Sequence, residues 1–289
     1  MRRYDFHQHL WPEPFIRALE RRAEPPRLRG SRLELSVEGS FEVDLGLHEL
    51  DERLALLDRY ELDIAVVSLA PTMETDAHEE LRAAYHDGIS ELADAASGRI
   101  VALGAGARPA GFAGACVSAE MFRAGVDPLL GELDRAGGLL FVHPGVPSPA
   151  HAGAPSWWAS VVGYTGQMQA AYATWRHRDA GRFPGVPIVF AILAGGAPIQ
   201  LERLRSRDLE ASSVPHENGF LDTSSYGRRA LELCLSTLGA SKLVFGSDVP
   251  VIDAGSTLTA VAGLGRAAAR TITSDNPARI LARATGSHV

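Results

Sequence analysis

Lysine, cysteine and long apolar runs are scarce in this chain of 289 residues. Lys242 is the only lysine, so any reaction that needs a Schiff-base or carbamylated lysine has a single candidate residue. Cys116 and Cys234 are too few and too far apart for a disulfide framework or a cysteine-based zinc site. No apolar stretch approaches the ~18 residues of a membrane span, and charged residues and histidines occupy the place of a signal peptide's apolar segment. These absences predict a reduced, cytoplasmic protein without a membrane partner.

An excess of basic charge is missing as well. Lys and Arg number 28 against 35 Asp and Glu, which gives a formal net charge of −7. Phosphate binding needs a basic face, so the composition argues against a nucleic-acid partner. With 46% hydrophobic residues the chain can bury a sizeable core. No repeat, low-complexity segment or linker divides it, so we expect one domain over residues 1–289.

Apolar runs of strand length alternate with segments of helical periodicity along the whole chain. We predict eight strands, at Arg3–His9, Asp63–Leu69, Ile100–Ala107, Gly114–Ala119, Leu139–His143, Pro187–Leu193, Gly219–Thr223 and Leu243–Ser247. Helices are expected at about 48–60, 78–97, 127–136, 157–179, 198–207, 226–238 and 256–269, with a last one opened by Asp275-Asn276-Pro277. This alternation indicates an α/β fold, a (β/α)8 TIM barrel. A doubly wound sheet is the alternative, but it requires a glycine-rich loop where this chain has Leu10-Trp11-Pro12.

The stretch from about residue 10 to 47 is too long for an ordinary loop of the barrel. Its alternating segments, Leu33–Val37 and Phe41–Val43, predict a small hairpin inserted after the first strand. The insertion is either a lid over the mouth of the barrel or a solvated surface excursion.

Polar side chains stand at the carboxyl ends of three predicted strands, where barrels of this kind carry their active sites. His7 and His9 are two residues apart on the first strand and therefore face the same side. His143 closes the fifth strand and Asp248 follows the eighth. A surface pair of histidines, a capping histidine and a turn aspartate would each explain one of these positions. Together they predict a site of nitrogen and oxygen ligands for one divalent ion, Zn²⁺ in preference to Mn²⁺ or Fe²⁺.

Substrate contacts are expected from aromatic, basic and histidine side chains in the loops at the same end of the barrel. The candidates are Trp11, Arg108, Trp157, His151 and His216. For each of them helix packing or a solvated surface position is the competing interpretation. Asp222, at the end of the seventh predicted strand, either shapes the pocket or caps the next helix.

The motifs Asp5–His9, Phe141–Gly145 and Gly246–Pro250 resemble those of the amidohydrolase superfamily. The similarity is greatest to the amidohydrolase-related branch that includes aminocarboxymuconate-semialdehyde decarboxylase, and Asn276–Leu281 resembles the closing helix of that family. The resemblance covers essentially the whole chain. It implies a metal, typically zinc, held at the four positions named above, and its barrels often form dimers, which makes a homodimer the assembly to expect.

The sixth predicted strand departs from that family. Its members usually carry a histidine before paired glycines, and here Leu193 stands at that position before Ala194-Gly195-Gly196. Leucine neither ligates a metal nor moves a proton, so Asp248 is the expected catalytic residue. The resemblance favours a metal-dependent enzyme that decarboxylates a small carboxylic acid without oxidation. Hydrolysis of an amide, ester or lactone is the alternative, and a metal-binding protein without turnover is the second alternative.

Overall fold

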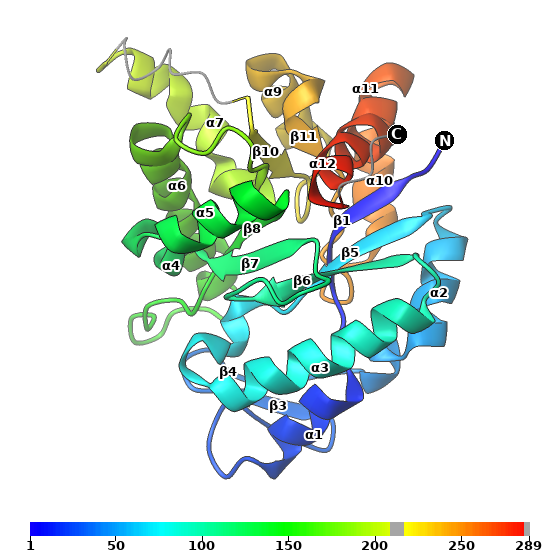
Figure 1. Ribbon diagram of the computed structural model, residues 1–289. Coiled ribbons are helices and arrows are strands. Elements are labelled where there is room, and N and C mark those ends of the chain that lie inside the picture. Colours follow the sequence, from blue (N-terminus) through cyan, green and yellow to red (C-terminus); the bar gives the residue numbers. More distant parts are fainter. Residues whose placement is uncertain (209–216, 286–289) are drawn as a thin grey trace.

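Eight parallel strands form a barrel at the centre of the computed structural model, which describes residues 1–208 and 217–285 (Figure 1). In barrel order the strands are β1 (Tyr4–His9), β5 (Ile64–Ser68), β6 (Ile100–Ala105), β7 (Gly114–Ser118), β8 (Leu139–His143), β9 (Ile188–Phe190), β10 (Gly219–Asp222) and β11 (Leu243–Val244). They follow each other along the chain in the same order. The predicted (β/α)8 architecture is therefore confirmed.

Hydrogen bonds between β1 and the segment after β11 join the two ends of the sheet. Phe6 N–H donates to the Phe245 carbonyl at 2.7 Å, Asp248 N–H to the His7 carbonyl at 2.8 Å, and His9 N–H to the Val249 carbonyl at 2.7 Å. The last strand is thus held to the first, which places Asp248 beside both histidines of β1. This register brings together residues that are far apart in the sequence.

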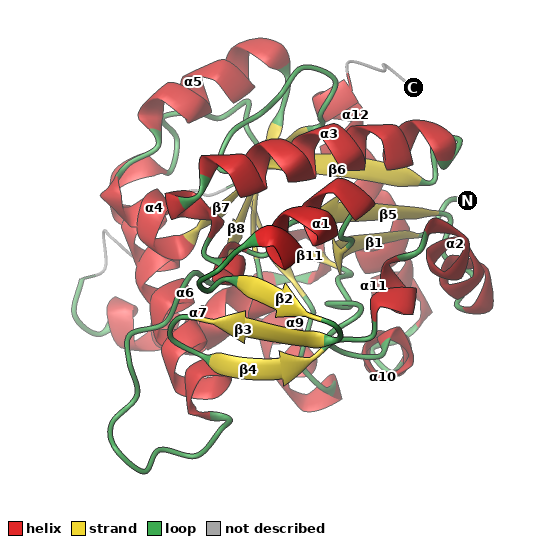
Figure 2. Cartoon of the chain, turned by 90° about the horizontal axis from the view of Figure 1, so that it is seen from below, coloured by secondary structure: helices red, strands yellow, loops and turns green. Residues whose placement is uncertain are grey.

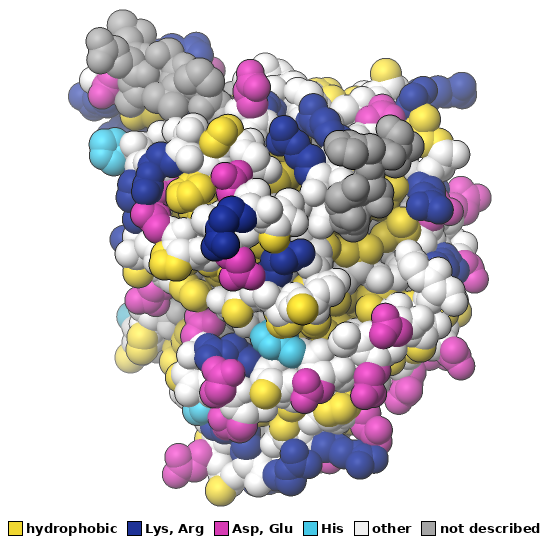
Figure 3. Space-filling view, in the orientation of Figure 1, with side chains coloured by type: hydrophobic (Ala, Val, Ile, Leu, Met, Phe, Trp, Pro, Cys, Tyr) yellow, Lys and Arg dark blue, Asp and Glu magenta, His cyan; other side chains and the backbone are white. Residues whose placement is uncertain are grey.

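Helices surround the strands on the outside of the barrel (Figure 1). Their bounds are α2 (Leu50–Arg59), α3 (Glu79–Ala95), α4 (Ala119–Ala124), α5 (Asp127–Ala136), α6 (Tyr164–Thr174), α7 (Ile192–Arg205), α9 (Arg228–Leu238), α10 (Ala254–Ala262), α11 (Arg266–Arg270) and α12 (Asn276–Thr285). Within the described residues no helix combines the length and apolarity needed to cross a bilayer. Arginine and acidic side chains are interspersed over the face shown in Figure 3.

The core fills the barrel and the layer between strands and helices. Every residue of β5, β7 and β8 is buried, as expected for parallel strands that are covered on both faces. Phe141 and Phe190 are fully buried, and the Phe190 ring packs edge-on against Phe122 with ring centres 5.9 Å apart. Continuous apolar runs therefore identify these strands in the sequence.

The insertion after β1 is more elaborate than the predicted hairpin. It contains α1 (Glu13–Arg21) and an antiparallel sheet of β2 (Arg27–Arg29), β3 (Arg32–Leu35) and β4 (Gly39–Glu42), seen in front of the barrel in Figure 2. Helix α1 buries Phe15 and Leu19 and packs along α3. Strand β2 spans only three residues with one buried apolar side chain, Leu28, which is too short a pattern to predict a strand from the sequence.

The chain after β9 also differs from the prediction. The sixth strand ends at Phe190, three residues earlier than expected, and Ile192 to Gly196 all adopt positive φ values between 46° and 78°. Such a run of left-handed residues is rare, and an isoleucine in it is strained because its branched Cβ meets the following carbonyl. The five residues form a tight turn at the carboxyl end of the barrel.

Candidate metal centre

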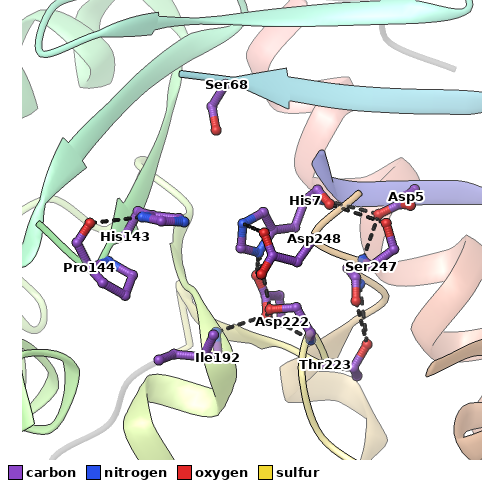
Figure 4. A network of polar contacts seen from close by, with 12 residues as sticks. Asp5, His7, Ser68, His143, Pro144, Ile192, Asp222, Thr223, Ser247 and Asp248 are labelled. Atoms are coloured by element: carbon purple, nitrogen blue, oxygen red, sulfur yellow. Dashed lines mark hydrogen bonds and ion pairs between the residues drawn. The ribbon is translucent and has the colours of Figure 1, made fainter. Parts of the chain in front are cut away.

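The four predicted ligands meet at the carboxyl end of the barrel. His7 and His9 come from β1, His143 ends β8, and Asp248 follows β11. Each offers one ligand atom, and these atoms all lie within 4.8 Å of one another. Figure 4 shows the side chains of His7, His143 and Asp248 directed toward one another.

Three of the donor atoms have the spacing of a tetrahedral metal shell. Nε2 of His7 lies 3.2 Å from Nε2 of His9, and Oδ1 of Asp248 lies 3.4 Å and 3.2 Å from these two nitrogens. Ligand bonds of ~2.0–2.1 Å at tetrahedral angles separate donor atoms by roughly 3.3 Å. A single divalent ion therefore fits among these three atoms with His143 on the remaining side.

Backbone carbonyls orient two of the three imidazoles. Nδ1 of His9 lies 3.0 Å from the carbonyl oxygen of Ser68, and Nδ1 of His143 lies 2.8 Å from that of Pro144. A carbonyl oxygen can only accept, so each Nδ1 carries the proton and each Nε2 keeps a free lone pair. This is the tautomer that a metal-ligating histidine needs.

A carboxylate orients the third imidazole. Oδ2 of Asp222, the last residue of β10, accepts from Nδ1 of His7 at 2.6 Å, and both side chains are fully buried. The other oxygen, Oδ1, accepts from Ile192 N–H at 2.9 Å and from the N–H and hydroxyl of Ser224 at 3.0 Å and 2.6 Å. Asp222 therefore shapes the site by fixing His7. Its place after a buried strand was the sequence signal, but its partner on β1 could not be read from the chain.

The electrostatics of the cluster favour a cation. Burial lowers the pKa of His7, but the carboxylates of Asp222 and Asp248 outweigh it and raise that pKa to about 9. Burial raises the pKa of Asp248, and the neighbouring imidazoles more than offset this, so that the net shift is downward. Burial, together with the neighbouring His7 and His9, holds the pKa of His143 well below its usual range. One fully buried carboxylate, Asp222, and one largely buried carboxylate, Asp248, thus favour positive charge at the cluster, which a divalent ion supplies more fully than one proton.

The backbone at Asp248 is itself constrained. Asp248 has φ 71°, a left-handed conformation that aspartate tolerates better than most residues. Gly246 leaves room for the ligands, because a Cβ there would lie 2.7 Å from Cβ of His7 and 3.1 Å from Asp222. Strained backbone of this kind persists where the surrounding structure holds it, which is common at functional sites.

Two adjoining cavities open onto the cluster. The inner cavity, of about 500 Å³, is bordered by His9, His143 and Asp248. Its walls are mostly apolar and include Val161 and Ile192. A mostly apolar hollow with a few converging polar groups is the usual form of a small-molecule site.

The outer cavity, of about 430 Å³, lies between the barrel and the insertion. Leu33, Leu35 and Phe41 of the insertion line it, and it shares His9 and Tyr164 with the inner cavity. The insertion thus borders the approach to the cluster.

The predicted substrate contacts fall in different places. Trp11 borders the outer cavity, where it is buried and stacked on His48 with ring centres 4.4 Å apart. Arg108 lines a separate cavity with Ile100 and Ala113, near the amino-terminal ends of β6 and β7. This place does not support a substrate contact for Arg108, because the cluster lies at the opposite end of the strands.

Trp157, His151 and His216 are not brought to the cluster by the described structure. Trp157 is 53% exposed and lies beside Trp158. His151 is exposed and packs edge-on against the same Trp158, with ring centres 4.8 Å apart. Neither borders the inner or the outer cavity. His216 lies outside the described residues.

The turn after β9 places Ile192, rather than Leu193, against the cluster. Ile192 borders the inner cavity, whereas Leu193 is buried in the core with 1% of its surface exposed. Leu193, the position at which the resemblance implies a histidine, therefore borders neither the inner nor the outer cavity. The side chain that does face the cavity here is also apolar.

Solved structures share this fold over nearly the whole chain. IDCase from Metarhizium anisopliae in apo form is 20% identical with a TM-score of 0.82, covering 98% of this chain and 97% of that one. A dihydroxybenzoic acid decarboxylase from Polaromonas with bound manganese and the inhibitor 2-nitroresorcinol is 15% identical, with a TM-score of 0.69 and coverage of 97% and 96%. 5-Carboxyvanillate decarboxylase from Sphingomonas paucimobilis is 17% identical with a TM-score of 0.66, covering 97% of this chain and 98% of that one.

At these identities the likeness establishes a common (β/α)8 fold. No family model matches the sequence, and no curated protein shows significant similarity to it. These likenesses identify the fold and not the reaction.

Proposed function

We propose that this protein is a divalent-metal-dependent decarboxylase of the amidohydrolase superfamily that acts on a small, singly charged aromatic or unsaturated carboxylic acid. The observation that carries the proposal is the set of three imidazoles whose Nδ1 atoms are all engaged, leaving their Nε2 atoms to converge with Asp248. The shared fold with several decarboxylases supports the choice of reaction.

His7, His9, His143 and Asp248 would hold the ion. Nitrogen donors with one carboxylate suit Zn²⁺ best, and the manganese in one structure of the same fold makes Mn²⁺ the second choice. When bound, the ion supplies positive charge that binds substrate oxygens and stabilises the negative charge that develops as carbon dioxide leaves. The protein holds the donor atoms in place and keeps water from the reacting carbon with the apolar walls of the inner cavity.

The charges around the cavities limit the substrate to one carboxylate. No lysine or arginine is among the described residues that line the inner or the outer cavity. Glu38, Glu42 and Asp44 border the outer one instead. A substrate carboxylate at the cluster meets the ion, but a second carboxylate would find no lysine or arginine among the described lining residues and would meet the acidic groups of the outer cavity. The apolar walls favour a planar ring or an unsaturated chain.

The test is carbon dioxide release by protein loaded with Zn²⁺ or Mn²⁺. The substrates are hydroxylated benzoic acids and unsaturated monocarboxylic acids, each paired with its dicarboxylic analogue, and a second panel contains esters, lactones and amides. We expect release from monocarboxylic acids, loss of it in His7→Ala, and a lower kcat/KM for each dicarboxylic analogue. Cleavage of the second panel without carbon dioxide release would replace decarboxylation by hydrolysis. Retained metal without turnover of either panel would overturn the enzymatic proposal.

A further inference from the structure

Two stacked side chains at the outer cavity carry nitrogen donors that the protein does not use. His48 ends the short 3₁₀ helix Leu45–His48 before α2, and Trp11 follows β1. Both border the outer cavity, although only 4% of His48 and 7% of Trp11 is exposed. Their ring centres are 4.4 Å apart and their planes 8° apart, so each ring holds the other in place.

The proton of the His48 imidazole is on Nε2. The backbone N–H of Trp11 donates to Nδ1 of His48 at 3.1 Å. A backbone N–H can only donate, so Nδ1 carries no hydrogen and the neutral ring has its proton on Nε2. Within residues 1–208 and 217–285 no acceptor engages this N–H, and the nitrogen is not enclosed by the protein. The Nε2–H of His48 therefore opens onto the outer cavity.

The indole of Trp11 is in the same situation. Its Nε1–H is a donor only, and no hydrogen bond to it is found in the described part of the chain, nor is this nitrogen enclosed. Buried polar groups, the N–H of tryptophan among them, usually have a hydrogen-bond partner. The two rings thus leave two donors for an acceptor that occupies the outer cavity.

The carboxylates of the outer cavity do not serve as these acceptors. Glu38 accepts from the Tyr164 hydroxyl at 2.6 Å, and Glu42 accepts from the Ser31 hydroxyl at 2.8 Å. Asp44 accepts from a backbone N–H of its own turn at 3.0 Å. The negative charges disfavour a ligand carboxylate beside the two N–H groups, and the N–H groups disfavour a ligand cation. An uncharged oxygen satisfies both conditions.

The outer cavity is within reach of a molecule bound at the cluster. His9, which directs Nε2 toward the other ligands, borders both cavities, and so do Ala70 and Tyr164. A substrate whose carboxylate lies at the ion therefore extends from the inner cavity into the outer one. Its far end then meets His48 and Trp11.

We propose that His48 and Trp11 determine specificity by donating hydrogen bonds to an uncharged oxygen at the end of the substrate away from its reacting carboxylate. This inference rests on the proposed function, which puts that carboxylate at the ion. It narrows the substrate class to aromatic or unsaturated monocarboxylic acids that carry a remote carbonyl, hydroxyl or ether oxygen.

The experiment measures dissociation constants for zinc-loaded protein by isothermal titration calorimetry, so it does not depend on turnover. The probes are benzoic acids with an acetyl group, or an isopropenyl group of the same shape, at the meta or the para position. Aminomethyl benzoic acids supply a cation instead. In at least one position the acetyl acid should bind about 10-fold tighter than the isopropenyl acid, because each hydrogen bond contributes a factor of roughly 2–10.

Two variants each remove one donor. His48→Asn keeps an amide oxygen near the place of Nδ1 for the Trp11 N–H, but its side chain is too short to reach the place of Nε2. Trp11→Phe keeps an aromatic ring and loses the indole N–H. Both should reduce the acetyl preference to about 3-fold or less and leave the affinity for the isopropenyl acid near wild type.

Two matched controls make the same substitutions elsewhere. His177→Asn changes an exposed histidine, and Trp158→Phe changes a half-buried tryptophan; neither residue borders the inner or the outer cavity. Both controls should keep the full acetyl preference. Nitrogen-15 NMR of histidine-labelled protein, with His48 assigned from its missing signals in His48→Asn, should show the proton on Nε2.

The outcomes separate this specificity from the reaction on which it rests. Equal binding of acetyl and isopropenyl acids, tighter binding of the aminomethyl acid, or a proton on Nδ1 of His48 would overturn the inference and leave decarboxylation in place. An equal loss of affinity for both acids in His48→Asn would show a structural role only and also overturn it. An acetyl preference that depends on His48, without carbon dioxide release from any acid, would support the specificity and refute the decarboxylase. Absence of binding by every probe would overturn the inference as well.

Discussion

Replacing Asp222 by asparagine should turn His7 from a ligand into a donor that faces the metal site. Oδ1 of Asp222 accepts hydrogen bonds from Ile192 N–H and from the N–H and hydroxyl of Ser224. An asparagine must put its amide oxygen there, because an NH2 group in that place would face donors. Its NH2 group then donates to Nδ1 of His7, and the imidazole proton moves to Nε2, where it blocks metal binding.

The size of the effect follows from the role of such supporting carboxylates. Loss of a group that orients a metal ligand costs roughly 10–100-fold in metal affinity, which is about 1.4–2.7 kcal/mol of binding free energy. Competitive titration with a chromophoric chelator measures the dissociation constant, and circular dichroism confirms that Asp222→Asn is folded. Asp253→Asn is the matched control. Asp253 is an exposed aspartate outside the cluster, and it caps α10 by accepting a hydrogen bond from Gly255 N–H. Wild-type metal affinity in folded Asp222→Asn would show that Asp222 does not set the tautomer of His7.

Two further predictions concern side chains near the cavities. Leu193→His should lower the free energy of unfolding by about 2 kcal/mol, because it buries an imidazole in the core. Ile192→His should be tolerated, because histidine accepts positive φ more easily than isoleucine. Chemical denaturation measures the free energy of unfolding of both variants. An equal decrease in the two would contradict the finding that Ile192, and not Leu193, borders the inner cavity. Burial, with Arg53 and His9, lowers the pKa of His48 to about 3. Below its ordinary pKa of 6.5 the unfolded chain therefore binds more protons than the folded one, and the free energy of unfolding decreases as the pH is lowered. When the pH is lowered from 7 to 5, the free energy of unfolding of His48→Asn should decrease by about 2 kcal/mol less than that of the wild-type protein. Parallel plots of the free energy of unfolding against pH would contradict this.

The strands and the ligand set are the part of the structure that local sequence patterns predict. Strands such as β8 are continuous apolar runs, because both faces are covered. His7 and His9 are two residues apart on one strand, and His143 and Asp248 stand at strand ends, so the barrel topology alone brings them to one end. A pattern within a few residues is sufficient for each of these predictions.

The parts that sequence patterns miss depend on partners far along the chain. Asp222 meets His7 across 215 residues, and Glu38 meets Tyr164 across 126; neither pairing leaves a local signal. The left-handed turn that directs Ile192 toward the cavity is held by Asp222 as well. Arg108 follows its strand closely in sequence, yet it lies at the other end of the barrel. Proximity along the chain was a poor guide to proximity in the fold there.

Metal content per chain is the direct measure of whether His7, His9, His143 and Asp248 bind an ion. The protein is purified without chelator, loaded with Zn²⁺ or Mn²⁺, freed of excess ion and examined by elemental analysis beside the His7→Ala/His9→Ala double variant. We expect a near-stoichiometric single ion in the wild-type protein and its loss in the folded double variant. Wild-type protein that retains no ion after loading, or a double variant that retains as much as wild type, would contradict this expectation.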